Sequence, residues 1–253
     1  MSTLLRISSY NTNIGHFLHQ SLDQLLQILR NNTQCILFIP DNLHTSNDLR
    51  WHSGIIKCLE SEVDSFSTKK MNNSNKNLDC LIINPEHPSK INVDNLFYLR
   101  NIIFKHFKIN DKLEDTYKVF YTRIQDTKRR HVYNYKSIEN NVDLVIHSLN
   151  ISFEETVKLF SKCSHFILVE GASFTNIIFM KSDAKMMDIS TRTDFRSFDG
   201  RPWSHNSWQV MFGSHELIKE FNIKSKATER ITCNKEEDHD FHDHIKITND
   251  LKE

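Results

Sequence analysis

Short apolar runs that end at a proline restrict most strongly how this chain can fold. Residues 35–39 read CILFI and stop at Pro40, and the run that begins at Cys80 closes at Pro85. Strands that are buried on both faces have this pattern, and such strands form parallel sheets. Segments with helical spacing lie between and after these runs, and the clearest of them is Val93–Phe107. Strands that alternate with helices predict an α/β protein with parallel sheets.

The alternation of strands and helices occurs twice along the chain. The expected strands are residues 4–8, 35–39 and 80–83 in the first set, and 118–123, 143–147, 165–169 and 185–189 in the second. The polar segment Asn110–Thr116 lies between the two sets and predicts a hinge. We therefore expect two small Rossmann-like domains, residues 1–112 and 113–225, that face each other across a cleft, and a charged tail at 226–253. Ligands of parallel sheets bind at the carboxyl ends of the strands, so the cleft is the predicted site.

Three local patterns complete the expected fold. Ser152 and Glu155 form a capping box, which predicts the start of a helix that continues to about Lys162. The polar, asparagine-rich segment Ser67–Asn77 is typical of an exposed loop. After about Lys224 the apolar periodicity is lost, which favours a loosely held tail.

Charge and cysteine content exclude several classes of protein. The 32 Lys and Arg residues equal the 32 Asp and Glu residues, so no net positive field is available for a nucleic-acid backbone or an anionic membrane. The five cysteines are odd in number and include no CxxC pair, which predicts buried free thiols in a reducing compartment. No signal peptide is visible at the start, and no apolar run approaches the ~20 residues that span a bilayer. We expect a cytoplasmic protein with no nucleic-acid partner and no membrane span.

The segment from Glu170 to Asn176, EGASFTN, follows an expected strand and opens an expected helix. Gly171 allows a tight turn and a close approach of the backbone to a ligand. Ser173, Thr175 and the free N–H groups of the first helical turn can then bind a diphosphate, which the helix dipole also favours. The alternative is an ordinary strand-to-helix turn with Ser173 as its cap.

A basic segment follows the expected strand at residues 118–123. Arg123 closes that strand and therefore points toward the same carboxyl edge, while Arg129 and Arg130 lie in the loop beyond, which ends at Asn134. Guanidinium groups bind phosphate oxygens through paired hydrogen bonds. The alternative is a solvated basic loop.

His16 ends the sequence Asn13-Ile-Gly-His16 at an expected strand-to-helix junction, and Asp23 follows rather more than one helical turn further on. A histidine that faces the cleft can deprotonate a hydroxyl near neutral pH. The spacing alone fits a structural histidine equally well.

Taken in order, these segments resemble glycosyltransferase family 61. The matching pieces are NIGHFLHQSLDQL, then YTR, RR and Asn134, then ISFEETVKLF, and finally EGASFTNIIFM and KMMDI. The resemblance extends from about Asn11 to Gly213, and the set from Tyr121 to Ile189 is the more specific in order and spacing. It implies a GT-B architecture, inversion at the anomeric carbon, a nucleotide-sugar donor and no metal requirement.

The resemblance also implies roles for individual residues. By position, the donor diphosphate would lie near Gly171, Ala172, Ser173, Thr175 and Asn176, with Arg123 and Arg130 completing the anion site. His16 would lie across the cleft, where it would deprotonate a hydroxyl of a glycan or protein acceptor, and Asp23 is the second candidate for that base. No cofactor is expected, and self-association into a homo-oligomer stays open.

Glu170 departs from the family, in which a histidine stands before Gly-Ala, and Phe174 replaces a leucine. A carboxylate beside a diphosphate would repel it, unless Glu170 instead accepts hydrogen bonds from ribose or sugar hydroxyls. Two alternatives therefore stay open: a non-catalytic nucleotide-sugar-binding relative, and another Rossmann-like transferase such as a methyltransferase. The second would need a glycine-rich first loop, and the N-terminal half contains only Gly15 and Gly54.

Metal-ligand residue types occur together at Asp238–His244, which reads DHDFHDH. This segment lies in the expected tail, where second-shell partners that orient ligands are not foreseen. No DxD motif follows a buried strand, as it would in a metal-chelating GT-A enzyme. The sequence therefore predicts no metal site.

Overall fold

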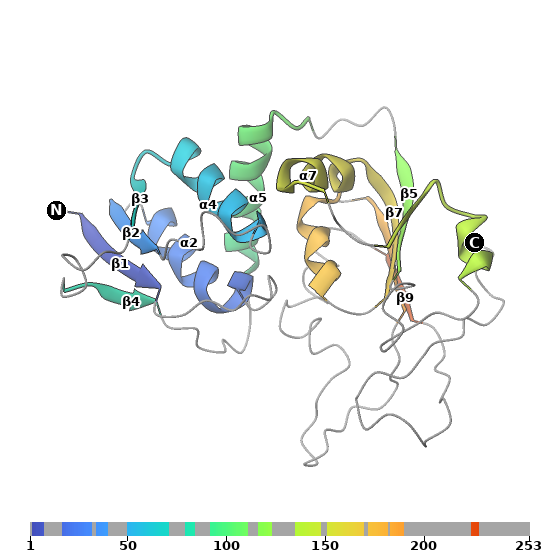
Figure 1. The fold of residues 1–253 in the computed structure, drawn as a ribbon, viewed down its shortest axis with the longest axis horizontal. Helices are drawn as coiled ribbons and strands as arrows, with labels where there is room; N and C mark the ends of the chain where they lie inside the picture. The colour runs from blue at the N-terminus through green and yellow to red at the C-terminus, as the bar shows by residue number, and fades with distance from the viewer. Residues whose placement is uncertain are drawn as a thin grey trace, which may run out of the picture. The chain divides into compact units, whose positions relative to one another are not determined.

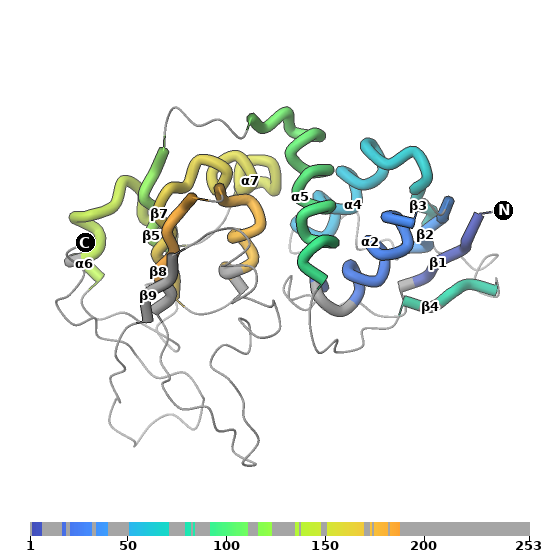
Figure 2. Tube along the Cα trace, turned by 180° about the vertical axis from the view of Figure 1, so that it is seen from behind, coloured from blue at the N-terminus to red at the C-terminus, as the bar shows by residue number. Residues whose placement is uncertain are grey.

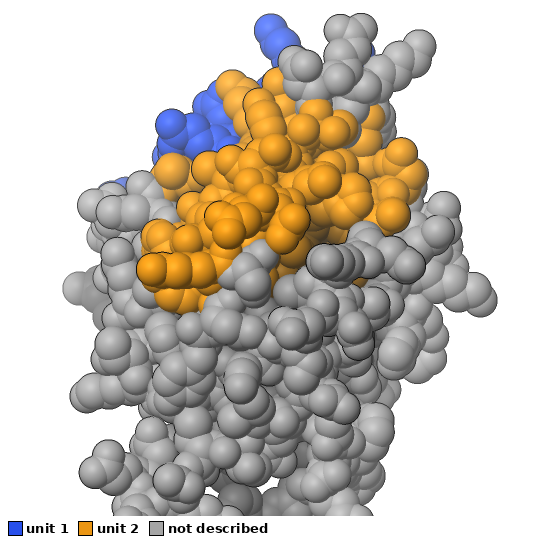
Figure 3. All heavy atoms as spheres, turned by 90° about the vertical axis from the view of Figure 1, so that its right-hand side faces the viewer, with its two compact units in different colours: residues 1–110, 152–155 blue, residues 111–151, 156–253 orange. Residues whose placement is uncertain are grey.

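The structure is a computed structural model of the 253-residue chain. It describes residues 2–7, 17–31, 34–39, 50–70, 79–83, 92–110, 116–122, 135–147, 151–169, 172–181, 183–189 and 224–227. The chain divides into two compact units: unit 1 comprises Met1–Asn110 with Ser152–Glu155, and unit 2 comprises Asp111–Ile151 with Thr156–Glu253. Figure 3 colours unit 1 blue and unit 2 orange.

Unit 1 contains a four-stranded parallel sheet with the strand order β3-β2-β1-β4. The strands are β1 (Thr3–Ile7), β2 (Cys35–Ile39), β3 (Phe66–Lys70) and β4 (Leu81–Ile83). Leu5 of β1 lies opposite Leu37 of β2, and both side chains are fully buried. The apolar run at Cys35–Ile39 is thus the inner strand β2, as predicted, whereas the run that begins at Cys80 forms the edge strand β4, in which Leu81 is 57% exposed.

The helices of unit 1 pack against one another beside this sheet (Figure 1). They are the π-helix η1 (Phe17–Leu22) and the α-helices α2 (Asp23–Arg30), α4 (Arg50–Glu62) and α5 (Val93–Phe107). Helix α5 begins at Asn92, whose side chain accepts a hydrogen bond from Asp94 N at 3.1 Å. It ends at Lys108, which adopts the left-handed conformation with φ 54°.

Unit 2 contains a five-stranded sheet with the order β6-β5-β7-β8-β9, and all its strand pairs are parallel. The strands are β5 (Tyr117–Tyr121), β6 (Leu144–Ile146), β7 (Cys163–Val169), β8 (Lys185–Ile189) and β9 (Lys224–Ala227). The helices are α6 (Lys136–Glu139), α7 (Phe153–Ser161) and the 3₁₀-helix η3 (Ala172–Phe179). The first turn of α7 belongs with unit 1.

Helices cover both faces of the unit 2 sheet (Figure 2). On one face Phe160 of α7 packs against Phe166 of β7, with ring centroids 4.8 Å apart and planes at 72°. On the other face Ile138 of α6 packs with Phe120 and Val169. This helix–sheet–helix layering is typical of Rossmann-like proteins, and it confirms the prediction of an α/β fold with parallel sheets.

The predicted capping box opens α7. Ser152 N donates to Glu155 Oε2 at 2.8 Å, and Glu155 N donates in return to Ser152 Oγ at 3.2 Å. Each side chain therefore satisfies one N–H group that the first helical turn leaves without an intrahelical acceptor.

Two segments were predicted wrongly as irregular. Ser67–Asn77 was expected to be a loop, but β3 runs to Lys70 and pairs with β2. Lys224, where the tail was expected to start, begins β9, which pairs with β8. Both strands lie at sheet edges and carry polar side chains, so hydrogen bonds to a neighbouring strand, rather than apolar patterning, define them.

The helices also differ in detail from the predicted ones. Residues 14–30 carry apolar side chains at helical spacing, which predicts one helix, but the described part of this segment is η1 followed by α2. The turn of Gly171–Met180 is a 3₁₀-helix over Ala172–Phe179.

The described cysteines carry free thiols, as the sequence predicted. Cys35, Cys58 and Cys163 are buried and Cys80 is half-buried, while Cys233 lies outside the described residues. Burial raises the pKa of Cys35 to about 11 and the pKa of Cys58 and of Cys163 to about 12. These thiols are therefore protonated at neutral pH and contribute packing rather than nucleophilic chemistry.

His165 of β7 lies between Lys118 of β5 and Lys185 of β8 in the register of the sheet. Burial lowers the pKa of His165, and the two lysines lower it further, against the opposing effect of Asp143. The folded protein therefore takes up this proton less readily than the unfolded chain. The resulting stability is present above the ordinary histidine pKa of 6.5 and is lost as the pH falls below it.

We therefore expect the wild-type Tm to fall between pH 7.5 and 5.5, and His165→Gln to fall less over the same range. Thermal melts at several pH values measure this difference. His147→Gln, at an exposed position of the same unit, is the matched control and should follow the wild type. Parallel pH profiles for the wild type and His165→Gln would contradict the role of His165.

Candidate functional site

The strand order of unit 2 creates a point where successive connections leave the sheet in opposite directions. From β5 the chain passes through α6 to β6 on one side, and from β7 it passes through η3 to β8 on the other. Strands β5 and β7 are adjacent and parallel, with Tyr121 opposite Leu168 near their carboxyl ends. Open parallel sheets bind ligands in the crevice at such a point. The candidate site of unit 2 lies where β5 and β7 end.

Two described segments reach this edge of the sheet. Thr122 directly follows β5, is fully buried, and donates its backbone N–H to Ile146 O at 2.9 Å. Helix η3 starts shortly after β7 and carries Ser173, Thr175 and Asn176, which the sequence analysis assigned to the donor. Thr175 and Asn176 are buried, so they point into the unit rather than into bulk solvent.

The side chain of Asn176 folds back onto the first turn of η3. Its Nδ2 donates to the carbonyl oxygen of Ser173 at 2.7 Å. A carbonyl oxygen can only accept, so the amide nitrogen must face Ser173 and the amide oxygen must face away. The hydrogen bond therefore fixes the orientation of the Asn176 amide within η3.

Three polar side-chain atoms at this edge are buried and have no hydrogen-bond partner among the residues that the structure describes. They are Thr122 Oγ1, Ser173 Oγ and Asn176 Oδ1. Buried polar atoms of native proteins are nearly always hydrogen-bonded, so each exception needs an explanation. These three atoms belong to the segments that follow β5 and β7, which makes this edge of the sheet the candidate site.

Most of the predicted site residues lie outside the described residues. These are His16, Arg123, Arg129, Arg130, Asn134, Glu170 and Gly171. In the sequence, Arg123 follows Thr122 directly, and Glu170 and Gly171 stand between the end of β7 and the start of η3. Ala172 is the first residue of η3. Thr122 is a further candidate, and its position between a strand and an arginine is visible in the sequence.

Asp23, the second candidate for the base, is the first residue of α2 and is bound to α5. Asn95 Nδ2 donates to Asp23 Oδ1 at 2.8 Å and to Asp23 O at 3.2 Å, and Asn95 itself is fully buried. Arg30 Nη1 donates to Asn95 Oδ1 at 2.9 Å. Burial raises the pKa of Asp23, although the Asn95 hydrogen bond opposes this. This set of contacts gives Asp23 a structural task, namely to hold α2 against α5.

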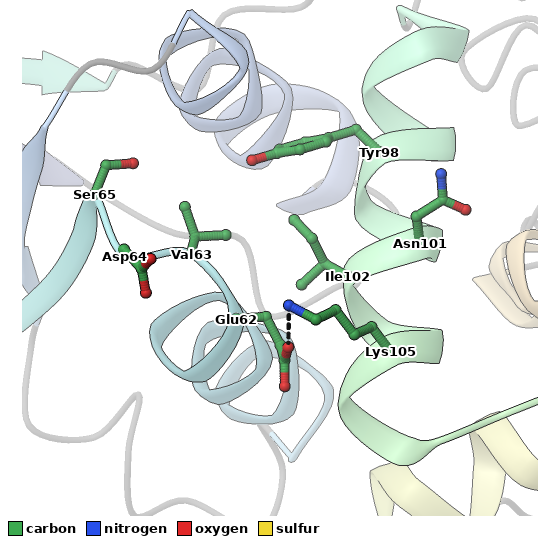
Figure 4. A pocket seen from close by; sticks show the side chains of 8 residues that line it. All are labelled: Glu62, Val63, Asp64, Ser65, Tyr98, Asn101, Ile102 and Lys105. Carbon is green, nitrogen blue, oxygen red and sulfur yellow. Dashed lines mark ion pairs between the residues drawn. The ribbon is translucent and has the colours of Figure 1, made fainter.

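A pocket of about 450 Å³ lies in unit 1, away from the carboxyl edge of its sheet (Figure 4). It is lined by Glu62, Val63, Asp64, Ser65, Tyr98, Asn101, Ile102 and Lys105. Lys105 Nζ lies 2.9 Å from Glu62 Oε2, and this contact lowers the pKa of Glu62. The pocket adjoins the turn that leads into the amino end of β3, and no predicted site residue lines it.

Two further features of the described residues bear on function. Within the described part of the chain, no group of three or more His, Cys, Asp or Glu side chains is placed to hold a metal ion, and Asp238–His244 lies outside that part. No described helix is both long enough and apolar enough to cross a bilayer.

One protein-family model matches most of the chain. The family model for glycosyltransferase 61 matches residues 14–187, which extend from just before η1 into β8. The matched range includes the candidate site at the ends of β5 and β7 as well as His16 and Asp23. No curated protein matches the chain at a significant level. A family match over more than half of its length shows that the chain belongs to glycosyltransferase family 61.

Proposed function

We propose that this protein is an inverting, metal-independent glycosyltransferase that uses a nucleotide-sugar donor and a hydroxyl acceptor on a glycan or a protein. Family membership supports a transferase with a sugar donor and a glycan acceptor. The observation that carries the finer assignment is the group of unpartnered atoms at the ends of β5 and β7, namely Thr122 Oγ1, Ser173 Oγ and Asn176 Oδ1. Thr122 directly precedes Arg123 in the sequence, and Ser173 and Asn176 belong to the helix that follows β7, so we expect hydrogen-bonding and cationic groups at the same edge.

The proposed reaction is a direct displacement at the anomeric carbon. His16 takes the proton of the acceptor hydroxyl, and that oxygen forms the new glycosidic bond. The bond between the anomeric carbon and the donor phosphate breaks, and its electron pair leaves with the nucleoside diphosphate. Arg123, Arg130 and the N–H groups at the start of η3 stabilise the negative charge that develops on the leaving phosphate.

The proposed architecture is GT-B, with two Rossmann-like domains at residues 1–112 and 113–225. The parallel sheets of the two units support this proposal, since each presents one carboxyl edge. In unit 1, His16 follows β1 in the sequence, and β1 lies between β2 and β4 in the sheet. A cytoplasmic location and a homo-oligomeric state are part of the proposal and are tested by fractionation and by light scattering.

Arg123→Ala and Arg130→Ala are expected to weaken nucleoside diphosphate binding about ten- to hundredfold, because a hydrogen bond to a charged group contributes about 1.5–3 kcal/mol. Calorimetric titration with UDP and GDP measures the loss. Lys162→Ala removes a cation from an exposed turn and is the matched control, which should bind like the wild type. Wild-type affinity in both arginine variants would remove the loop from the donor site.

Sugar transfer is expected to continue in the presence of EDTA, because arginines and backbone N–H groups take the place that a metal ion has in other transferases. The measurement is the rate of donor turnover before and after chelation. A loss of transfer that manganese restores would contradict the proposal, and Asp238–His244 would then be the first segment to examine.

A non-catalytic nucleotide-sugar-binding protein is the second candidate function, and Glu170 is the residue that favours it. Its carboxylate stands where the resemblance to the family places a histidine. Donor hydrolysis or transfer by the purified wild-type protein would exclude this candidate. Binding without turnover, combined with turnover in Glu170→His, would support it.

A further inference from the structure

Three basic residues lie side by side on the inner strands of the unit 2 sheet. Lys118 of β5 is the register partner of His165 of β7, and His165 is in turn the partner of Lys185 of β8. Register partners in neighbouring parallel strands project from the same face of the sheet, about 4.8 Å apart from one strand to the next. The three side chains therefore form one row across the sheet, which we call the basic row.

The basic row lies on the face of the sheet that α6 covers, near the amino ends of the strands. Phe120 follows Lys118 by two residues and therefore shares its face, where it packs with Ile138 of α6. Lys118 and Lys185 are nevertheless exposed, and His165 is half-buried. Inner strands of parallel sheets normally carry apolar side chains on both faces. Basic groups on three inner strands therefore mark a part of this face that is open to solvent.

The charge of the basic row is not balanced by the described residues. Neither lysine side chain forms an ion pair with a described residue. Burial lowers the pKa of His165, and the charges of Lys185 and Lys118 lower it further. The opposing charge is that of Asp143, whose Oδ2 also accepts a hydrogen bond from Lys118 N at 2.8 Å. An anion beside the two lysines would offset their positive field and would favour protonated His165.

We propose that the basic row binds an acidic glycan, whose carboxylate or sulfate groups lie beside Lys118 and Lys185. The two lysines are two strand spacings apart, about 10 Å, which suits an extended chain with repeated charges. The protein has no net positive charge, which favours a short anionic segment over a nucleic-acid backbone. The proposal rests on the glycan acceptor of the proposed function and adds an accessory acceptor site to it.

The basic row is separate from the candidate site at the carboxyl ends of the strands. Lys118 stands four residues before Thr122, which corresponds to about 13 Å of extended chain. The row therefore binds a segment of the acceptor away from the hydroxyl that reacts. Its contribution is to acceptor affinity and to the choice of acidic over neutral glycans.

The test measures binding and requires no turnover. The probes are tetragalacturonate, its neutral methyl ester, a heparin tetrasaccharide and a thymidine tetranucleotide, each titrated into the wild-type protein at low salt and followed by NMR. At least one of the two acidic oligosaccharides is expected to bind, and the one that binds identifies carboxylate or sulfate as the recognised group. The methyl ester and the tetranucleotide are expected to bind about tenfold or more weakly.

Lys118→Gln and Lys185→Gln are each expected to weaken binding of the acidic oligosaccharide about two- to fivefold, and the double variant about tenfold. Lys158→Gln, at an exposed position of α7 over the opposite face, is the matched control and should bind like the wild type. Because the bound anion favours protonated His165, wild-type affinity should rise between pH 7.5 and 5.5, and it should rise less in His165→Gln.

Three outcomes would overturn the assignment and leave the proposed function intact, because none of them involves turnover. They are the absence of binding by both acidic oligosaccharides, equally tight binding of the methyl ester or the tetranucleotide, and wild-type affinity in the double lysine variant. Conversely, a purified protein that binds the acidic oligosaccharide through the basic row but transfers no sugar would contradict the proposed function alone.

Discussion

His16→Ala is expected to lower kcat for sugar transfer by about 10²–10⁴-fold, the range over which a general base contributes to a rate. The base acts only while the proton moves, so its removal should leave donor affinity nearly unchanged. Steady-state kinetics and calorimetric donor titration on the same preparation measure the two quantities. Arg123→Ala and Arg130→Ala, by contrast, should lose donor affinity.

Two neighbouring substitutions serve as controls for His16→Ala. His19→Ala removes another histidine three residues further along the chain and should keep wild-type turnover. Asp23→Asn tests the second candidate base, and because Asp23 Oδ1 accepts from Asn95 at 2.8 Å, an amide oxygen can keep that contact. Wild-type kcat in His16→Ala would show that the base is another group, and a large loss in Asp23→Asn would identify it.

Gly54→Ala is expected to destabilise the protein by about 1–3 kcal/mol, the usual range for an overpacked interior. In an open position of a helix the same change would stabilise it by about 0.5–1 kcal/mol, because glycine loses more backbone freedom on folding. Here a Cβ at Gly54 of α4 would lie 2.8 Å from Phe153 Cβ and closer still to the Phe153 ring. No helix-propensity gain can offset contacts this short.

Phe153 has little room to move away. It is 5% exposed, and its ring lies against Trp51 at 5.5 Å and Phe107 at 5.9 Å between centroids. Its Cβ is attached directly to the backbone of α7, so a rotation of the ring alone does not relieve the clash. The absence of a side chain at Gly54 is therefore a requirement of packing between α4 and the first turn of α7.

Urea unfolding followed by circular dichroism measures the effect of Gly54→Ala. Lys57→Ala, at an exposed position of the same helix, is the control and should change the free energy of unfolding by less than about 0.5 kcal/mol. Phe153→Ala is destabilising by itself, but the double variant should lose less than the sum of the two single variants. A more stable Gly54→Ala protein would show that Phe153 does not occupy this space.

The sequence by itself determined the elements whose information is local. The apolar run at Cys35–Ile39 and the helix at Val93–Phe107 were predicted with the bounds that the structure has. The capping box of Ser152 and Glu155 was also predicted, because both partners lie within one helical turn. In each case the pattern of side chains within a few residues specifies the conformation.

The family was also predicted from the sequence. Motif order from His16 to Ile189 indicated glycosyltransferase family 61, which the match over residues 14–187 confirms. The carboxyl ends of the parallel strands were predicted to bind the ligand, and this location of the site stays a prediction. The roles of individual residues stay predictions, because a sequence does not show which side chain contacts a ligand.

Only the tertiary structure decided the features that depend on distant partners. Strands β3 and β9 exist because β2 and β8 supply their hydrogen bonds, and their own side chains give little sign of it. Asp23 is bound by Asn95, 72 residues further along the chain, and the space at Gly54 is taken by Phe153. The orientation of the Asn176 amide depends on a single carbonyl group that the fold of η3 brings within 2.7 Å. Backbone pairing, burial and steric exclusion act between residues far apart in sequence, and therefore no local pattern could reveal them.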